Sequence, residues 1–183
     1  MHDTADSWMT PLDNSSNTFL HDFLGGLVEF EDGHIPGPNT PPEGVYPKGL
    51  TIKNIGGETP VHSAAHAGHL DWIPTSLITK EAITTADNDG RTPMHNAARS
   101  GHLNQMPIEL LTEETLSTIN NEGYTPLAEA SAHNHLDQLL GIKFSNEIIQ
   151  DVGPEWYEKN ENILKQQESV GEQEAETAEI ELF

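Results

Sequence analysis

The chain has 183 residues, of which 34% are hydrophobic, and it contains no cysteine. These values allow one domain with a real core, and they exclude a disulfide framework, a thiolate metal site and a cysteine nucleophile. Thirty acidic residues against eight basic ones give a formal net charge of -22, which disfavours binding to nucleic acid or to anionic membranes.

Residues 1–40 form a polar N-terminal segment with one predicted helix, at about residues 18–30. Phe19, Phe23 and Leu27 recur there at helical spacing, which gives the helix an apolar face. That face needs a partner surface. We expect it to cap the exposed first unit of the repeat array described below, with docking on another protein as the alternative.

A 33-residue unit then occurs three times, over residues 57–89, 90–122 and 123–153. The copies share a glycine, a Thr-Pro dipeptide, a run of small residues and a leucine at fixed positions. Self-similarity at this period predicts stacked supersecondary units. The aligned columns include Thr59, Thr92 and Thr125, each followed by proline, and Leu70, Leu103 and Leu136.

The shared pattern, G-x-T-P-x-H-x-A-A-x-x-G-H-L, resembles the ankyrin repeat over a little over half of the chain. The resemblance implies an all-α fold, an ankyrin-repeat solenoid of stacked helix-turn-helix units with helical end caps. The third copy departs from the pattern. Ala128 stands where the first two copies have His62 and His95, and Asn134 replaces the glycine.

Residues 41–56 are predicted to be the second half of a degenerate repeat. Shifted by 33 residues, they place Pro41 on Pro74 and Leu50 on Ile83. The first half of this repeat has been replaced, and we expect the helix at 18–30 to supply the missing packing.

Local signals define the first helix of each full repeat. Glycine permits the preceding tight turn, threonine is a preferred N-cap, and proline suits the first helical position. Gly68 and Gly101 are expected to end the first two of these helices. The leucine of each copy should then begin the second helix and point inward.

The second helices are predicted to be short and broken, because Pro74 and Pro107 stand where each should continue. We expect the segment beginning at Leu70 to break by Ile73. A new helical turn should then start at Thr79, and by register also at Thr112.

Beyond the repeats, residues 154–167 are predicted to form a C-terminal capping helix with an apolar face. Residues 168–183 form an acidic tail that we expect to be disordered. The final IELF is read as a frayed end, with a short docking motif as the alternative.

Histidines raise the question of a metal site, because His62, His66 and His69 have a spacing that would share one helix face. The ankyrin resemblance implies that His62 and His69 are structural, with ring nitrogens bonded to turn backbone. His66 then stands alone, and Arg99 takes its place in the second copy. We therefore predict neither a metal site nor a cofactor.

The sequence shows no catalytic motif, no phosphate loop and no basic stripe, so we expect neither an enzyme nor a nucleic-acid-binding protein. The resemblance implies a non-catalytic protein–protein interaction module that binds a partner through its concave face. Turn-tip and first-helix positions are the candidate binding residues: Glu58, His66, Asn88, Asp89, Arg91, Arg99, Asn121, Glu122, Tyr124 and His133.

The alternative is an acidic inhibitor or immunity-type protein that blocks a basic target such as a nuclease. Either way the expected partner is another protein, possibly a basic one, and the default oligomeric state is a monomer. We expect a cytoplasmic location, because neither a signal peptide nor an apolar run of membrane-spanning length is visible.

Overall fold

The computed structural model of the chain describes residues 48–144 and 152–166. Three predicted regions lie outside these ranges, namely the helix at 18–30, the beginning of the half repeat and the tail at 168–183. No membrane crossing could be made by any helix within the described residues, since none combines the necessary length and apolarity.

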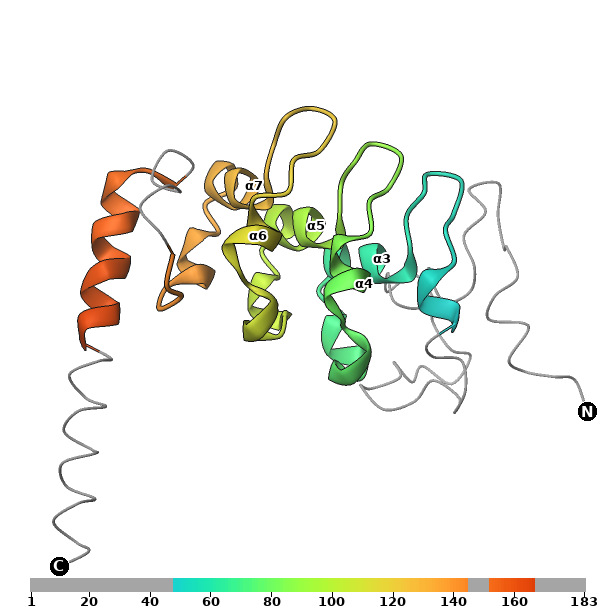
Figure 1. Cartoon of the computed structure of the whole chain (residues 1–183), viewed down its shortest axis with the longest axis horizontal. Helices are drawn as coiled ribbons and strands as arrows, with labels where there is room; N and C mark the ends of the chain where they lie inside the picture. Colours follow the sequence, from blue (N-terminus) through green and yellow to red (C-terminus); the bar gives the residue numbers. More distant parts are fainter. Residues whose placement is uncertain (1–47, 145–151, 167–183) are drawn as a thin grey trace, which may run out of the picture.

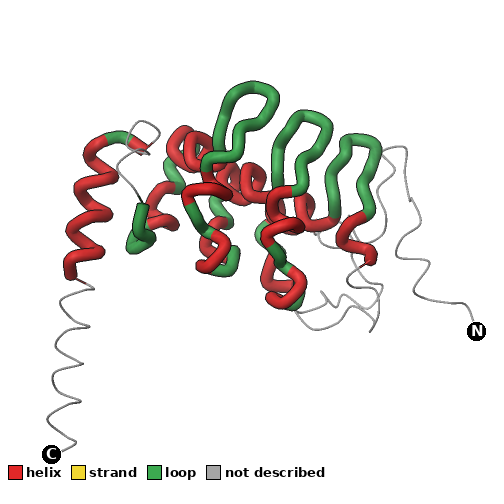
Figure 2. Tube along the Cα trace, viewed as in Figure 1, coloured by secondary structure: helices red, strands yellow, loops and turns green. Residues whose placement is uncertain are grey.

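Within the described ranges the chain is helical and has no strand, as the all-α prediction requires (Figures 1 and 2). The first helices of the three repeats are α3 (Pro60–Ala67), α5 (Pro93–Ser100) and α7 (Pro126–Ala132). The other elements are η1 (Lys48–Thr51), η2 (Leu70–Trp72), η3 (Thr75–Leu77), α4 (Lys80–Thr84), η4 (Leu103–Gln105), η5 (Ile108–Leu110), α6 (Glu113–Leu116), η6 (Leu136–Leu139) and a helix over 154–166.

The predicted start and stop signals of the first helices are confirmed. Thr59, Thr92 and Thr125 are the N-caps, each in extended backbone conformation and each followed by proline at the first helical position. Gly68 and Gly101 end α3 and α5 in the left-handed conformation, with φ of 78° and 80°. A side chain disfavours this conformation, which explains the glycines.

The broken second helices are also confirmed. In repeat 1 the 3₁₀ segment η2 ends before Ile73, and Pro74 separates it from η3. Helix α4 then begins anew after Thr79, whose Oγ1 accepts a hydrogen bond from Ala82 N at 3.2 Å. Repeat 2 follows the same course, with Thr112 capping α6.

Helices α3, α5 and α7 lie side by side (Figure 1), and the core forms between them and the segments that follow each of them. Small residues allow this close approach, since the alanine pairs of α3 and α5 are fully buried. Leu70 and Leu103 are fully buried as predicted. Leu136 is only half-buried, and Leu139 is the fully buried side chain of the third repeat.

The helix over 154–166 packs against the third repeat. Trp156 Nε1 donates to Leu136 O at 2.8 Å, and the Trp156 ring lies 6.1 Å from that of Phe144. Asn160 is buried, accepting from Gly141 N at 2.7 Å and donating to Ile142 O at 2.8 Å. These contacts fix the helix against the loop that follows η6.

Candidate functional site

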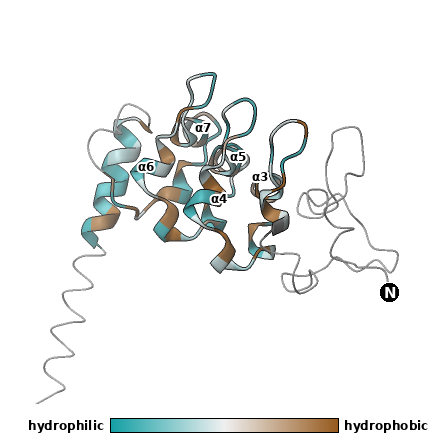
Figure 3. Ribbon diagram, turned by 45° about the vertical axis from the view of Figure 1, so that its right-hand side comes forward, coloured by the Kyte–Doolittle hydropathy of each residue, from teal (hydrophilic) through white to brown (hydrophobic). Residues whose placement is uncertain are grey.

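Three turn tips project from the same side of the row of first helices (Figures 1 and 2). We call them finger 1 (54–58), finger 2 (87–91) and finger 3 (120–124). In each finger the first residue donates its backbone N–H to the carbonyl of the fifth, at 2.9, 2.7 and 3.0 Å respectively. Hydrophobic residues gather in the helical layer, whereas fingers 2 and 3 are largely hydrophilic (Figure 3).

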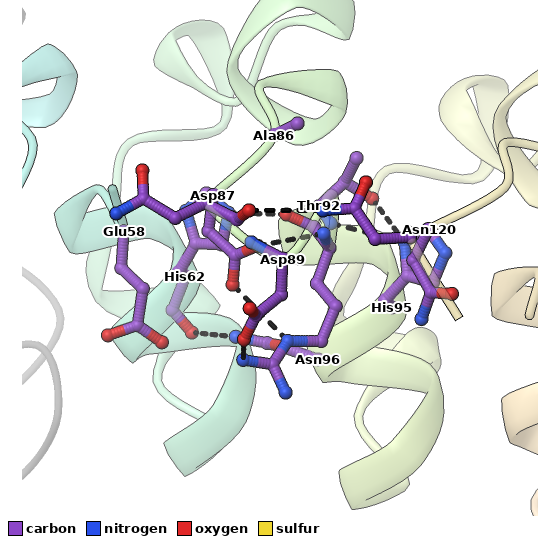
Figure 4. Close-up of polar contacts among 12 residues, drawn as sticks. Glu58, His62, Ala86, Asp87, Asp89, Thr92, His95, Asn96 and Asn120 are labelled. Atoms are coloured by element: carbon purple, nitrogen blue, oxygen red, sulfur yellow. Dashed lines mark hydrogen bonds and ion pairs between the residues drawn. The ribbon is translucent and has the colours of Figure 1, made fainter. Parts of the chain in front are cut away.

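The first side chain of each finger closes the turn from inside. Asp87 Oδ1 accepts from Asp89 N at 2.9 Å and from Arg91 N at 2.8 Å (Figure 4). The amide oxygen of Asn120 accepts in the same way from finger 3, at 3.0 and 2.9 Å. Each finger is therefore held by its own side chain as well as by backbone.

Asparagines at the second position connect one finger to the next. Asn88 donates from its backbone N to Gly56 O at 2.9 Å and from Nδ2 to Ile55 O at 2.9 Å. Asn121 repeats both bonds toward finger 2, to Asp89 O at 2.9 Å and to Asn88 O at 3.1 Å. These two predicted binding residues thus use their donors to align the fingers.

Histidines at the N-termini of α3 and α5 connect helix caps to fingers. Thr59 N donates to His62 Nδ1 at 3.0 Å, so that nitrogen must be an acceptor and the ring proton sits on Nε2. His62 Nε2 then donates to Arg91 O of finger 2 at 3.2 Å. His95 repeats the arrangement, with Thr92 N at 3.1 Å and Tyr124 O of finger 3 at 3.1 Å.

The environment of both histidines favours the neutral ring. Burial lowers the pKa of His62 and of His95 below the ordinary value of 6.5, because a buried charge is poorly solvated. The geometry acts in the same direction. A proton on Nδ1 would face the backbone N–H of the N-cap threonine, which can only donate.

A second histidine column ties each repeat to the one before it. His102 Nδ1 donates to Ala65 O at 3.2 Å, and His135 Nδ1 donates to Ala98 O at 3.0 Å. The rings lie so close to the preceding helix ends that a Cβ at Gly68 would come within 2.7 Å of His102 Nε2. The predicted structural role is confirmed for both columns, but only His62 and His95 bond turn backbone, whereas His102 and His135 bond carbonyls of α3 and α5.

The two predicted binding arginines are engaged within the molecule. Arg91 lies between Asp87 and Asp89, with Nε 3.3 Å from Asp87 Oδ2. Arg99 reaches across to repeat 3 and donates twice to Glu129, from Nε at 3.1 Å and from Nη2 at 2.7 Å.

The two side chains of the Arg99–Glu129 ion pair differ in burial. The Glu129 side chain is 5% exposed, whereas that of Arg99 is 39% exposed. The hydrogen bonds that Arg99 donates to Glu129 raise the pKa of Arg99, and the nearby charge of Glu122 adds to the effect. His133 completes the cluster, with Nδ1 2.9 Å from Glu129 O and 3.6 Å from Glu129 Oε2.

The remaining candidates differ in exposure. Glu58 is half-buried and accepts from Asn54 Nδ2 at 3.0 Å, whereas His66 is exposed and lies 2.9 Å from Ser100 Oγ. Glu122 is exposed, and Tyr124 is 52% exposed. The ten candidates lie on the fingers, on α3 and α5, and at the residue that follows α7. We call this set the finger face: Glu58, His66, Asn88, Asp89, Arg91, Arg99, Asn121, Glu122, Tyr124 and His133.

Two relevant residues escaped the sequence prediction. Glu129 was indistinguishable from a solvated helix acid, although it is buried under Arg99. Asn120 is buried at the base of finger 3. The 33-residue register could have revealed Asn120, because it aligns this residue with Asn54 and Asp87. Each of the three lies four residues before a finger-face residue.

In the part of the chain that the structure describes, no group of three or more His, Asp or Glu side chains could hold a metal ion. The nitrogens of His62 face the N-cap threonine and Arg91 O. The ring of His69 stacks on Trp72, with centroids 3.9 Å apart.

Comparison with known proteins identifies the repeat. A family model described as ankyrin repeats, in three copies, matches residues 44–111 and 87–144. A search among curated proteins finds no match. The family model spans more than half of the sequence and coincides with the fingers and helices described above. The chain belongs to the ankyrin-repeat family.

Proposed function

We propose that this protein is a non-catalytic binding module whose finger face contacts a protein partner. Ankyrin repeats are generally protein–protein interaction modules. Fold alone does not assign a partner, so the proposal depends on what the finger face offers.

The observation that carries the proposal is the exposure of Tyr124 on a rigid support. Its side chain is 52% exposed on finger 3, while its own carbonyl accepts from His95 Nε2 at 3.1 Å. Asn121 fixes the same finger to finger 2. An aromatic anchor held in place before binding loses little freedom on association, which favours affinity.

Charge supports a basic partner. The basic side chains between residues 53 and 99 are all engaged internally: Lys53 with Ala86 O, Lys80 with Glu114, Arg91 with Asp87 and Asp89, and Arg99 with Glu129. Glu122 remains exposed beside Tyr124. With thirty acidic residues against eight basic ones, the chain presents a net negative field to an approaching protein.

Site-specific photocrosslinking tests the proposal. A benzophenone amino acid replaces Tyr124 in the full chain, which is then incubated in native extract and irradiated. The control carries the same group at Ile108, which is 71% exposed in η5, away from the fingers (Figure 1). We expect Tyr124 to capture a defined protein that Ile108 does not. Identical products from both positions would contradict the proposal.

The inhibitor function is the second candidate, favoured by the net charge of -22. It predicts that the captured partner is basic and that binding weakens steeply with salt, because long-range attraction is screened. Competition by DNA or RNA for the same partner would support it. Binding that is insensitive to salt and to competing nucleic acid would exclude the inhibitor function. The general protein-binding function would then remain.

A further inference from the structure

The first position of the fingers reveals a difference between repeats. Each of these side chains has a second polar atom besides the oxygen that closes the turn. In finger 1, Asn54 Nδ2 donates to Glu58 Oε2 at 3.0 Å. In finger 2, Asp87 Oδ2 accepts from Arg91 Nε at 3.3 Å. In both, the residue four positions later supplies the partner.

Finger 3 lacks this second contact. Asn120 is 4% exposed, and its Nδ2 is buried without a hydrogen-bond partner, the only such side-chain atom in the described parts of the chain. The amide orientation is fixed, because its oxygen accepts from the N–H groups of Glu122 and Tyr124. Turning the amide over would set donor against donor.

The cause is the residue at the fifth position of the finger. Glu58 and Arg91 carry groups that complete the pair, whereas Tyr124 places an aromatic ring there. Asn120 Nδ2 is itself closed to solvent, whereas Tyr124 in the same finger is 52% exposed, so an acceptor from outside reaches the donor only when finger 3 shifts. Buried polar groups are nearly always bonded, and this donor gains a hydrogen bond if such a shift admits an acceptor.

We propose that a bound partner supplies this acceptor to Asn120 Nδ2 as an uncharged main-chain carbonyl, with Tyr124 packing against the neighbouring partner side chain. The inference rests on the proposed function and assigns finger 3 as its specific contact. A carboxylate would fit the donor equally well, as Glu58 shows in finger 1. However, exposed Glu122 and the net charge of -22 oppose an anion there.

Nuclear magnetic resonance of the full chain can test this with N-methylacetamide as a peptide-carbonyl probe. We expect the probe to shift the side-chain NH₂ signals of Asn120 and to leave those of Asn54 in place, because Glu58 already occupies that donor. Sodium acetate at equal concentration should have the smaller effect on Asn120. Equal responses of Asn54 and Asn120, no response of Asn120, or a stronger response to acetate would overturn the proposal.

Two variants provide matched controls. Tyr124→Glu copies finger 1 into finger 3 and should abolish the response of Asn120. Asn120→Asp retains the turn-closing oxygen, as Asp87 does in finger 2, and removes the donor. Circular dichroism checks that each variant is folded. A persisting perturbation of finger 3 in Asn120→Asp would contradict the assignment.

The two proposals can fail separately. If N-methylacetamide leaves Asn120 unchanged while crosslinking at Tyr124 captures a defined partner, only the hydrogen-bond inference is lost. If crosslinking at Tyr124 matches the Ile108 control while Asn120 still responds to the probe, finger 3 has a donor site but the finger face is not the partner surface.

Discussion

The polar groups of fingers 1 and 2 are bonded within the molecule, whereas finger 3, where repeat 2 meets repeat 3, has an unbonded donor. His62 and His95 each join a helix cap to the following finger, but the third repeat has Ala128 at this position. The orphan donor of Asn120 and the exposed ring of Tyr124 also lie in finger 3. The difference suggests that regular copies build the scaffold and that the divergent copy is where a partner binds.

The largest expected effect comes from His95→Ala, which gives repeat 2 the residue that repeat 3 has naturally. The change leaves Thr92 N and Tyr124 O without their buried partner. Lost hydrogen bonds and a cavity should lower the free energy of unfolding by about 3 kcal/mol, or about 6–12 °C in melting temperature. Thermal denaturation measures this loss of stability. A loss under about 1 kcal/mol would show that the hydrogen bonds of His95 to Thr92 N and Tyr124 O contribute little.

A smaller loss is expected from Arg99→Met, which removes one ion pair between repeats 2 and 3. It leaves the Glu129 carboxylate buried without its counter-ion, and we expect about 2 kcal/mol of destabilisation, since Arg99 is partly exposed. Adding Glu129→Gln removes the stranded charge and should recover part of the loss. A double variant that is less stable by the sum of both single losses would contradict this coupling.

Exchanging Gly101 and Asn134, which occupy the same position in repeats 2 and 3, compares the two repeats through a smaller change in stability. Gly101→Asn places a side chain where a Cβ would lie 2.9 Å from His135 Nε2, at a φ of 80°. We expect a loss of about 1–2 kcal/mol in chemical denaturation. The reciprocal Asn134→Gly should change stability by less than about 1 kcal/mol, because Asn134 already tolerates a φ of 61°. Equal effects of both changes would refute the role of the histidine contact.

Mild acid should produce the smallest effect, because it alters charge without removing packing. The folded-state pKa values of His62 and His95 lie below the ordinary value of 6.5. The unfolded chain therefore binds protons first, so their contribution is fully present above about pH 6.5 and declines as the pH falls toward the folded-state values. Urea midpoints between about pH 7.5 and about pH 5.5 should decrease, and less so in His95→Ala. A flat profile would contradict the neutral-ring assignment.

The sequence predicted local structure well because its signals are local. Thr59 and Pro60 mark a helix start, and Pro74 and Thr79 mark a break and a restart, whatever the neighbours do. The candidate surface was less predictable. Glu129 is buried and accepts two hydrogen bonds from Arg99 of the preceding repeat, a contact between residues 30 apart in sequence.

The same limit applies to the finger asparagines. Asn88 and Asn121 are exposed turn residues, and sequence alone suggests that they are available to a partner. Their donors instead bond the carbonyl of the adjacent finger. These hydrogen bonds become visible only when the repeats are stacked in the structure, since they join residues one 33-residue period apart. The unbonded donor of Asn120 depends equally on tertiary structure, because Tyr124 stands where Glu58 and Arg91 supply a bonding partner in fingers 1 and 2.

The most direct test of the central claim is the affinity of the partner captured at Tyr124 for variants of fingers 1 and 3. Ile55 and Tyr124 are both large and exposed, at 68% and 52%, and occupy fingers at opposite ends of the row. If repeat 3 is the binding copy, calorimetry should show Tyr124→Ala weakening binding by about tenfold or more, with Ile55→Ala within about twofold of wild type. Equal losses, or a larger loss for Ile55→Ala, would contradict it.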